Sequence, residues 1–376
     1  MGKINVPRLL AKTLILLILI IFGISPIITD HLGQVSIYNW IVPGRMRFPY
    51  SDNPGQSYSL SLFDIEANFS SHVVSGKPLS SGEFRVFVIG DSSTWGTLLR
   101  PENTLVGQLN QLGLHTPEGF PVQFYNLGYP TLSLTKDLFL LENSIDYQPD
   151  MIIWLFTLES FPNDKQLRSP LVANNHNKVS SMIEEYDMDL NREDDTFVKS
   201  SFWDQTLIGE RRNLADIIRL QLYGVMWAIT GIDQDYPTDF EQAKRDFEED
   251  TSFHDWEEGE MTDADLAYHI LHSGHMISGD TPILLVNEPI LIGDGMNSDL
   301  RYNFYYPIWA YDQYRQTIKT LSNQNNWIYI DLWDLVPEKE FTNTAIHTTP
   351  EGVGMIANKL SSPILDNIGM NSSAGE

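Results

Sequence analysis

The chain of 376 residues contains no cysteine, so it can form no disulfide framework, thiol nucleophile or thiolate metal site. Basic residues are also scarce, because 24 Lys and Arg stand against 50 Asp and Glu, which gives a formal net charge of −26 at pH 7. This balance argues against a nucleic-acid partner, whose phosphates would be repelled. It also argues against docking on anionic lipid head groups by charge alone.

Long apolar runs are missing except near the start of the chain, where residues 13–29 carry no charge. That length is at the lower limit for a membrane-spanning helix. The run is long for a signal peptide and no small-residue cleavage site follows, so we predict an uncleaved anchor, with a cleaved signal peptide as the alternative. Basic residues precede the run and Asp30 follows it, so residues 1–12 are expected in the cytoplasm and the rest outside.

Residues 84–89 form an apolar, β-rich run that stops at Gly90 and is followed by Asp91 and Ser92. A buried strand that breaks into such a turn delivers a hydroxyl group to the carboxyl edge of a sheet, at the N-terminus of the next helix. Backbone N–H groups at that place suit an anionic tetrahedral intermediate. Ser92 is therefore the candidate nucleophile, and a plain strand-to-helix connection is the alternative.

Far along the chain, His347 stands just before a predicted helix start. Thr348 and Glu351 have the spacing of a capping box, and Pro350 suits a first helical turn. A histidine held on a loop by a capped helix is well placed as a general base, although a lone loop histidine can also be merely solvated.

Together, residues 90–92 and 347–352 resemble the first and last sequence blocks of the SGNH, or GDSL-type, hydrolases. Residues 125–131 resemble the second block, and residues 149–156 resemble the strand that leads into the third. The resemblance implies a hydrolase or acyltransferase without a cofactor, in which a serine attacks an ester and a histidine takes its proton. It further implies that N–H groups of Ser92 and of the turn from Gly128 to Thr131 hold the oxyanion.

The chain departs from this family in two blocks. Glu159 stands where an asparagine would donate to the oxyanion, and a carboxylate cannot donate unless it is protonated. The pair at 163–164, Asn-Asp, is a weak substitute. Thr344 stands where an aspartate would orient the histidine, with Asn343 one residue earlier. Either a Ser-His dyad operates, or the orienting group is another residue, for which Glu159, Glu288 and Asn343 are the candidates.

The order of apolar runs predicts an α/β domain over residues 83–366. Each run leaves room for a helix before the next, which is typical of a parallel sheet between helices. We expect a flavodoxin-like three-layer sandwich with a central parallel sheet of five strands, the fold that the resemblance to SGNH hydrolases also implies. The predicted strands are 84–89, 122–126, 151–157, 282–287 and 327–332, and the predicted helices are 104–112, 134–145, 307–321 and 350–360.

Three further segments accompany this domain: an irregular lead-in over residues 30–82, an insertion over about 165–280 and a C-terminal tail over 367–376. The insertion contains a predicted helix at 213–230 that packs in the core, covers the site as a lid or lies in a membrane interface. Its acidic run at 246–265 is expected to be a solvated face. It also holds His269, His272 and His275 at intervals of three, for which we expect no metal, because no ligand from a separate element accompanies them.

These observations favour a membrane-anchored, extracytoplasmic serine esterase or acyl hydrolase. Its substrate would be an acylated carbohydrate or a small ester, for example an acyl group on cell-envelope glycans. One alternative is an accessory O-acyltransferase that works beside a multi-spanning membrane acyltransferase. The other is a non-catalytic envelope protein that keeps the fold.

Overall fold

The computed structural model describes residues 6–23, 65–70, 72–78, 82–198 and 240–374, together with isolated residues between 215 and 230. The chain divides into two compact units. The first unit comprises residues 1–76, 173–176 and 197–235, and the second comprises 77–172, 177–196 and 236–376. The candidate site lies within the second unit.

The described part of the first unit includes two helices, α1 (Val6–Gly23) and α4 (Ile65–Ser70), and the short 3-10 helix η1 (Val73–Gly76). Among the described residues, no helix combines the length and hydrophobicity needed to cross a membrane. The end of the predicted anchor, most of the predicted lead-in and most of the predicted helix at 213–230 lie outside the described residues. The anchor stays a prediction.

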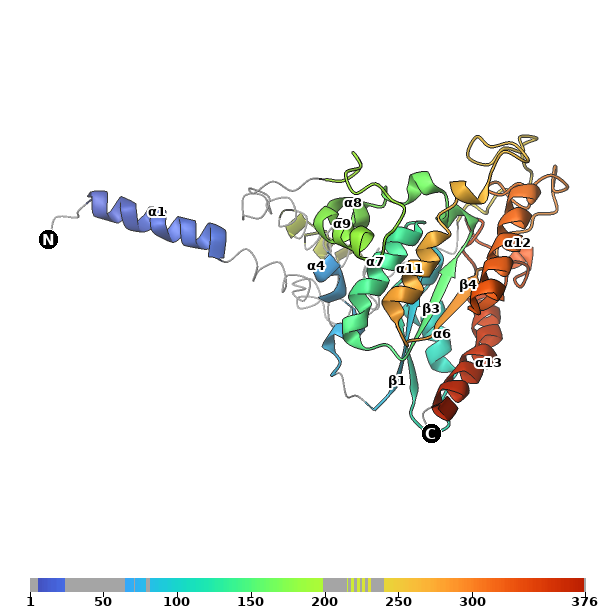
Figure 1. Cartoon of the computed structure of the whole chain (residues 1–376), viewed down its shortest axis with the longest axis horizontal. Helices are drawn as coiled ribbons and strands as arrows, with labels where there is room; N and C mark the ends of the chain where they lie inside the picture. Colours follow the sequence, from blue (N-terminus) through green and yellow to red (C-terminus); the bar gives the residue numbers. More distant parts are fainter. Residues whose placement is uncertain are drawn as a thin grey trace. The chain divides into compact units, whose positions relative to one another are not determined.

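The second unit is built on five parallel strands in the order β2-β1-β3-β4-β5 (Figure 1). This is the flavodoxin-like order predicted above, and each strand ends within one residue of its predicted range. Because the strand order reverses between β1 and β3, the carboxyl end of β1 lies at the topological switch point, where sites of open α/β sheets form. The strands are β1 (Phe84–Ile89), β2 (Val122–Asn126), β3 (Met151–Phe156), β4 (Ile283–Asn287) and β5 (Ile328–Asp331).

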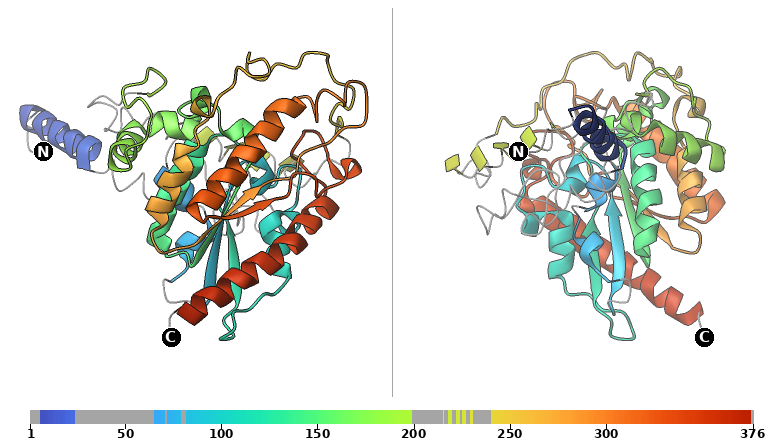
Figure 2. Two further views of the ribbon diagram at one scale, coloured as in Figure 1. Left: turned by 45° about the vertical axis from the view of Figure 1, so that its right-hand side comes forward. Right: turned by 90° about the vertical axis from the view of Figure 1, so that its left-hand side faces the viewer.

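Helices cover both faces of the sheet, which gives the expected three layers (Figure 2). The first face is covered by α6 (Leu105–Gln111) and α13 (Pro350–Ala374), and the second by α7 (Leu134–Ser144), α11 (His269–Ser278) and α12 (Ile308–Asn325). The remaining described helices are α5 (Ser92–Trp95), α8 (Pro170–Asn174) and α9 (His176–Glu185).

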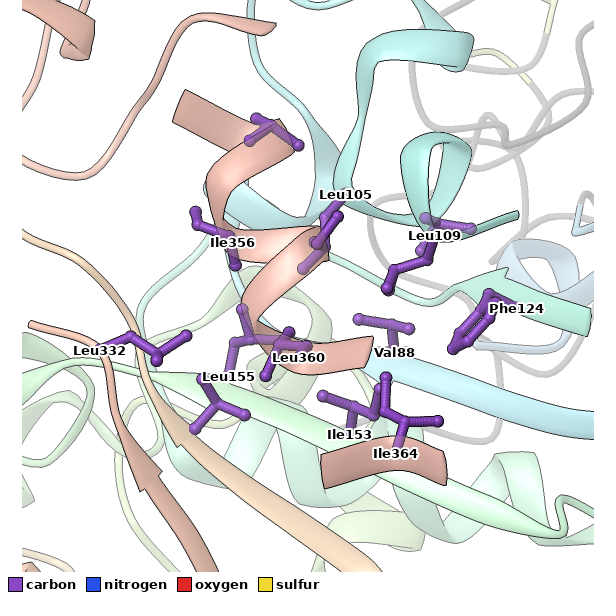
Figure 3. Close-up of a cluster of buried hydrophobic side chains, with 14 of the residues drawn as sticks. Val88, Leu105, Leu109, Phe124, Ile153, Leu155, Leu332, Ile356, Leu360 and Ile364 are labelled. Atoms are coloured by element: carbon purple, nitrogen blue, oxygen red, sulfur yellow. The ribbon is translucent and has the colours of Figure 1, made fainter. Parts of the chain in front are cut away.

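The core on the first face follows from the two periodicities of strand and helix. Alternate strand residues such as Val88 and Ile153 meet helix residues spaced by four, such as Ile356, Leu360 and Ile364 (Figure 3). Burying one side chain of this size stabilises a fold by about 1.5–3 kcal/mol. This face therefore holds the loop before α13 close to the sheet.

Helix α13 begins at Pro350, as predicted, but its capping residue and its C-terminal end differ from the prediction. Its N-terminal cap is Thr349, whose Oγ1 accepts the N–H of Gly352 at 3.2 Å, one residue later than the predicted cap at Thr348. At the other end the helix continues to Ala374, through most of the predicted tail, because Ile364 and Ile368 extend the apolar stripe into the core.

The three histidines of the insertion lie on α11. The rings of His272 and His275 both pack against Trp327 with centroids 4.6 Å apart, and Nδ1 of His275 hydrogen-bonds the carbonyl oxygen of Leu271 at 2.9 Å. Within the described part of the chain, no group of three or more His, Asp or Glu side chains could hold a metal ion.

Candidate active site

Ser92 is the first residue of α5, directly beyond the carboxyl end of β1. Asp91 caps this helix, and its Oδ1 accepts the N–H of Ser93 at 2.7 Å. Helix α5 is a single turn that ends at Gly96, whose φ of 91° lies in the left-handed region that favours glycine. The local sequence thus presents the Ser92 hydroxyl at the edge of the sheet.

Gly90 is required by the close packing of this turn. A Cβ atom on Gly90 would lie 2.3 Å from Oγ1 of Thr94 and 3.2 Å from the carbonyl oxygen of Leu155 on β3. Any side chain there would push the turn away from the neighbouring strand. Glycine before Asp91 therefore fixes the position of the Ser92 hydroxyl group.

The structure brings Ser92 and His347 together although 255 positions separate them. Oγ of Ser92 lies 2.8 Å from Nε2 of His347, and Nδ1 of the same ring lies 3.0 Å from Oδ1 of Asn343. If Nδ1 donates its proton to the amide oxygen of Asn343, Nε2 is left to accept the proton of Ser92. Asn343 is thus the only one of the three orienter candidates to contact the imidazole among the described residues.

Two threonines, Thr342 and Thr344, hold the loop that carries His347 through hydrogen bonds to its backbone. The backbone N–H of His347 donates to Oγ1 of Thr344 at 3.1 Å. The carbonyl oxygen of His347 accepts the N–H of Thr342 at 2.8 Å and its hydroxyl at 3.1 Å. Thr344, in the position where the family resemblance implies an acid, is therefore engaged with the backbone and not with the imidazole.

Electrostatics favour a neutral imidazole. His347 is buried, and burial lowers its pKa from the usual 6.5, while the negative charge of Asp91 acts in the opposite direction. A neutral histidine within hydrogen-bond reach of a hydroxyl group is the arrangement that a general base requires.

The predicted oxyanion donors are only partly available. The N–H of Gly128 donates to Oδ1 of Asn126 at 2.9 Å, and the N–H of Thr131 donates to the carbonyl oxygen of Tyr129 at 2.7 Å. The N–H of Ser92 has no acceptor among the described residues. Gly128 and Thr131 would have to give up these bonds to hold an oxyanion, so Ser92 is the donor in place.

Gly128 has a packing role instead. A Cβ atom on it would lie 2.3 Å from the backbone nitrogen of Trp95, so the loop after β2 rests directly on α5. Asn126, which the sequence analysis did not single out, ties the same two elements, because its Nδ2 donates to the carbonyl oxygen of Thr94 at 3.0 Å. Its place at the end of β2, on the same edge as Ser92, is the signal that could have identified it.

Glu159 does not reach His347. Its carboxylate forms an ion pair with Lys165, and Nε2 of His254 lies 3.1 Å and 3.2 Å from its two oxygens. Partial burial lowers the pKa of Lys165 to about 8, with a smaller contribution from Arg168. The weak substitute for the missing asparagine is also elsewhere, because Asn163 donates to the carbonyl oxygen of Ala264 at 2.7 Å.

Glu288 contacts the turn that carries Ser92 rather than the imidazole of His347. Its Oε2 accepts a hydrogen bond from the hydroxyl group of Ser93, and the side chain is buried near Asp91. Burial, followed by the negative charge of Asp91, raises the pKa of Glu288 well above its usual value. Oε1 of Glu288 and Oδ2 of Asp91 are buried without a partner among the described residues, and a proton on Glu288 allows the two carboxyl groups to coexist.

Lys136 on α7 also belongs to this region, and the sequence analysis missed it. Its side chain is fully buried and contacts the turn before Ser92. The available signal was a Lys-Asp pair at 136–137 within a helix that is otherwise strongly apolar on its buried face.

Comparison with known proteins gave similarity in structure only: no protein-family model and no curated protein matched the sequence. The structural neighbours include a member of the lipolytic protein G-D-S-L family from Veillonella parvula, with 10% identity and a TM-score of 0.35 over 74% of this chain and 96% of the other. A carbohydrate acetylesterase family member from Sinorhizobium meliloti has 13% identity and a TM-score of 0.36 over 76% and 98%.

The native aryl esterase of M. smegmatis has 12% identity and a TM-score of 0.31 over 74% of this chain and 98% of the other. The neighbours are thus GDSL-type lipolytic proteins and esterases. At such low identities and TM-scores, the chemistry of this chain has to be argued from its own residues.

Proposed function

We propose that this chain is a serine hydrolase that cleaves carboxylic esters, with Ser92 as nucleophile and His347 as general base. The observation that carries the proposal is the contact of 2.8 Å between Oγ of Ser92 and Nε2 of His347. The imidazole is buried and its pKa is lowered, so that it is neutral when it meets the hydroxyl. Asn343 holds the other ring nitrogen and so selects the tautomer that can accept the proton.

The reaction proceeds in two halves. Oγ of Ser92 attacks the ester carbonyl carbon while its proton passes to Nε2 of His347, and the carbonyl oxygen becomes an oxyanion near the N–H of Ser92. Collapse of this intermediate breaks the ester bond, and the proton on Nε2 passes to the departing alkoxide. Water then attacks the acyl-enzyme and gives a proton to Nε2 of His347. Collapse of this second intermediate breaks the bond between the acyl group and Oγ, which takes the proton back from Nε2, so that the carboxylic acid leaves and both Ser92 and His347 are restored.

The proposal includes the place of action, which rests on the N-terminal sequence alone. The charge-free run over 13–29 and the basic residues before it favour an anchor with the domain outside the cytoplasm. Deleting residues 1–29 should therefore release protein that stays in the supernatant after a carbonate wash at high pH. Pelleting of the shortened chain with membranes would show that another segment binds them.

A second candidate is a protein that keeps the fold without catalysis. It is favoured by the internal hydrogen bonds of the Gly128 and Thr131 N–H groups, which leave Ser92 as the only predicted oxyanion donor without an acceptor among the described residues. Losing one such donor typically costs about 100- to 1000-fold in turnover. A weak esterase and a non-catalytic protein thus differ in degree, and only a direct reaction at Ser92 separates them.

A fluorophosphonate probe tests the proposal on the full chain. The wild-type protein and Ser93→Ala should be labelled and should cleave an activated ester. Ser92→Ala should do neither, with an almost unchanged thermal transition, because the hydroxyl group lies in a turn outside the apolar core. Equal labelling of Ser92→Ala, or loss confined to Ser93→Ala, would refute the assignment. Absence of any labelling of the wild type would favour the non-catalytic candidate.

A further inference from the structure

Lys136 is a lysine whose side chain is 0% exposed, in the first turn of α7. A buried ammonium is costly unless acceptors surround it. Here it has three donors and three acceptors: the carbonyl oxygen of Gly90 at 2.8 Å, the carbonyl oxygen of Tyr129 at 3.1 Å, and the carboxylate of Asp137. Its hydrogen-bonding capacity is therefore filled.

The two carbonyl acceptors belong to the two loops of the candidate site. Gly90 ends β1 immediately before Asp91 and Ser92, and Tyr129 lies in the loop after β2. The regular pairing of β1 with β2 ends at Val88, and beyond it the loop after β2 stays tied to β1 through the N–H of Leu127, which donates to the carbonyl oxygen of Val88 at 2.9 Å. The N–H of Tyr129 also donates to the carbonyl oxygen of Gly90, at 2.9 Å. This oxygen therefore accepts two hydrogen bonds, one from a peptide N–H and one from the ammonium group of Lys136.

We propose that Lys136 is a positioning residue for the proposed esterase reaction: its ammonium sets the orientation of the Gly90–Asp91 peptide and thereby aims the N–H and hydroxyl of Ser92. The inference rests on the proposed function, because it concerns the alignment of the same nucleophile. Lys136 touches neither Ser92 nor His347 in the structure. Its effect passes through the backbone of the turn.

Fold stability alone is a poor explanation for this lysine. Replacing a buried ion pair by apolar side chains is often neutral or stabilising, so a stable helix here does not need the charge. Burial also raises the pKa of Asp137 to about 6, against the lowering effect of Lys136. Burying the charged pair therefore costs free energy that the attraction between the two groups does not fully offset. What an apolar residue could not supply is a donor to two loop carbonyls at once.

The test separates positioning from stability by removing the charges in two ways. Lys136→Met alone leaves Asp137 buried without its partner and should lower both the thermal transition and activity. Lys136→Met combined with Asp137→Asn leaves no buried charge and should recover the thermal transition. In this double variant we expect kcat on an activated ester to stay about 10- to 100-fold below wild type with KM nearly unchanged, because small misplacements of reacting groups cost about that much.

Two further variants complete the design. Asp137→Asn alone keeps the ammonium with its two carbonyl acceptors and should keep most of the wild-type kcat, and this comparison decides the matter if the double variant does not fold. Lys319→Met, at an exposed lysine of α12, is the matched control and should behave as wild type.

Recovery of full kcat together with stability in the double variant would overturn the inference while leaving the proposed function intact. A loss in Asp137→Asn as large as that in Lys136→Met would do the same. A wild-type protein that neither labels nor turns over would refute the proposed function, and this inference with it.

Discussion

Asn343→Asp is the substitution that most directly tests whether residue 343 orients the imidazole ring of His347. The present side chain offers a neutral oxygen 3.0 Å from Nδ1 of His347, and the substitution offers a charged one at the same place. Two unit charges 4 Å apart interact by about 1 kcal/mol in water and about 4 kcal/mol at an effective dielectric constant of 20. Asn343 is exposed, so the gain should lie near the lower end of that range, at about 1–2 kcal/mol.

This gain translates into a shift of the pH profile. Burial lowers the pKa of His347 from 6.5, so the wild-type kcat/KM should fall only below pH 6.5, where the imidazole becomes protonated and can no longer act as a base. A carboxylate beside Nδ1 stabilises the imidazolium and raises the pKa by about one unit, since one unit corresponds to about 1.36 kcal/mol. The acidic limb should move up by that amount, and the rate above it should rise up to about tenfold.

Two variants bracket this result. Asn343→Ala removes the acceptor, and because water can replace it at an exposed position, the loss should be about 1 kcal/mol, or about fivefold in kcat. Thr344→Asp introduces the same charge one residue later, where the present side chain accepts backbone N–H groups, so its acidic limb should stay near that of the wild type. An unmoved limb in Asn343→Asp, or an equal shift in both aspartate variants, would refute the assigned orientation.

Three other substitutions have expected outcomes. Glu288→Gln should leave kcat at neutral pH nearly unchanged, since Glu288 contacts Ser93 and not His347; because burial raises the pKa of Glu288, wild-type stability is lost relative to the variant as pH rises above 4.5, which thermal unfolding across pH would show. Glu159→Gln should lower the thermal transition without moving the acidic limb of the pH profile, because its partners are Lys165 and His254; a moved limb would contradict this. Gly128→Ala should cost about 1–3 kcal/mol and reduce probe labelling, because its methyl group meets backbone; an unchanged melting temperature would count against the close approach.

The sequence was sufficient to predict the sheet and the turn that carries Ser92, because both depend on local patterns. Buried parallel strands read as continuous apolar runs, and Gly90 marks the break at which β1 ends. The loop of His347 was also visible, through the helix start behind it. The cap itself was placed one residue too early: Thr348 has Glu351 at the spacing of a capping box, but it is Thr349 whose Oγ1 accepts the N–H of Gly352.

The residue that contacts the imidazole could not be identified from the sequence. Glu159 and Glu288 both follow strands and so reach the same edge of the sheet as Ser92, and their charge made them the stronger candidates on chemical grounds. The structure gives Glu159 a partner 95 positions away, His254, and turns Glu288 toward Ser93. Such pairings depend on which side chain points where, and neither spacing nor residue type contains that information.

The packing of α13 has a consequence for the proposed activity during synthesis of the chain. His347 lies three residues before the start of α13, which covers one face of the sheet. Ribosomes add about 5–20 residues per second, and domains tend to fold from the N-terminal side. The turn of Ser92 therefore emerges long before His347, and the proposed pair of serine and histidine forms only when α13 docks. The proposed esterase would thus be inactive until α13 has been synthesised and has packed on the sheet.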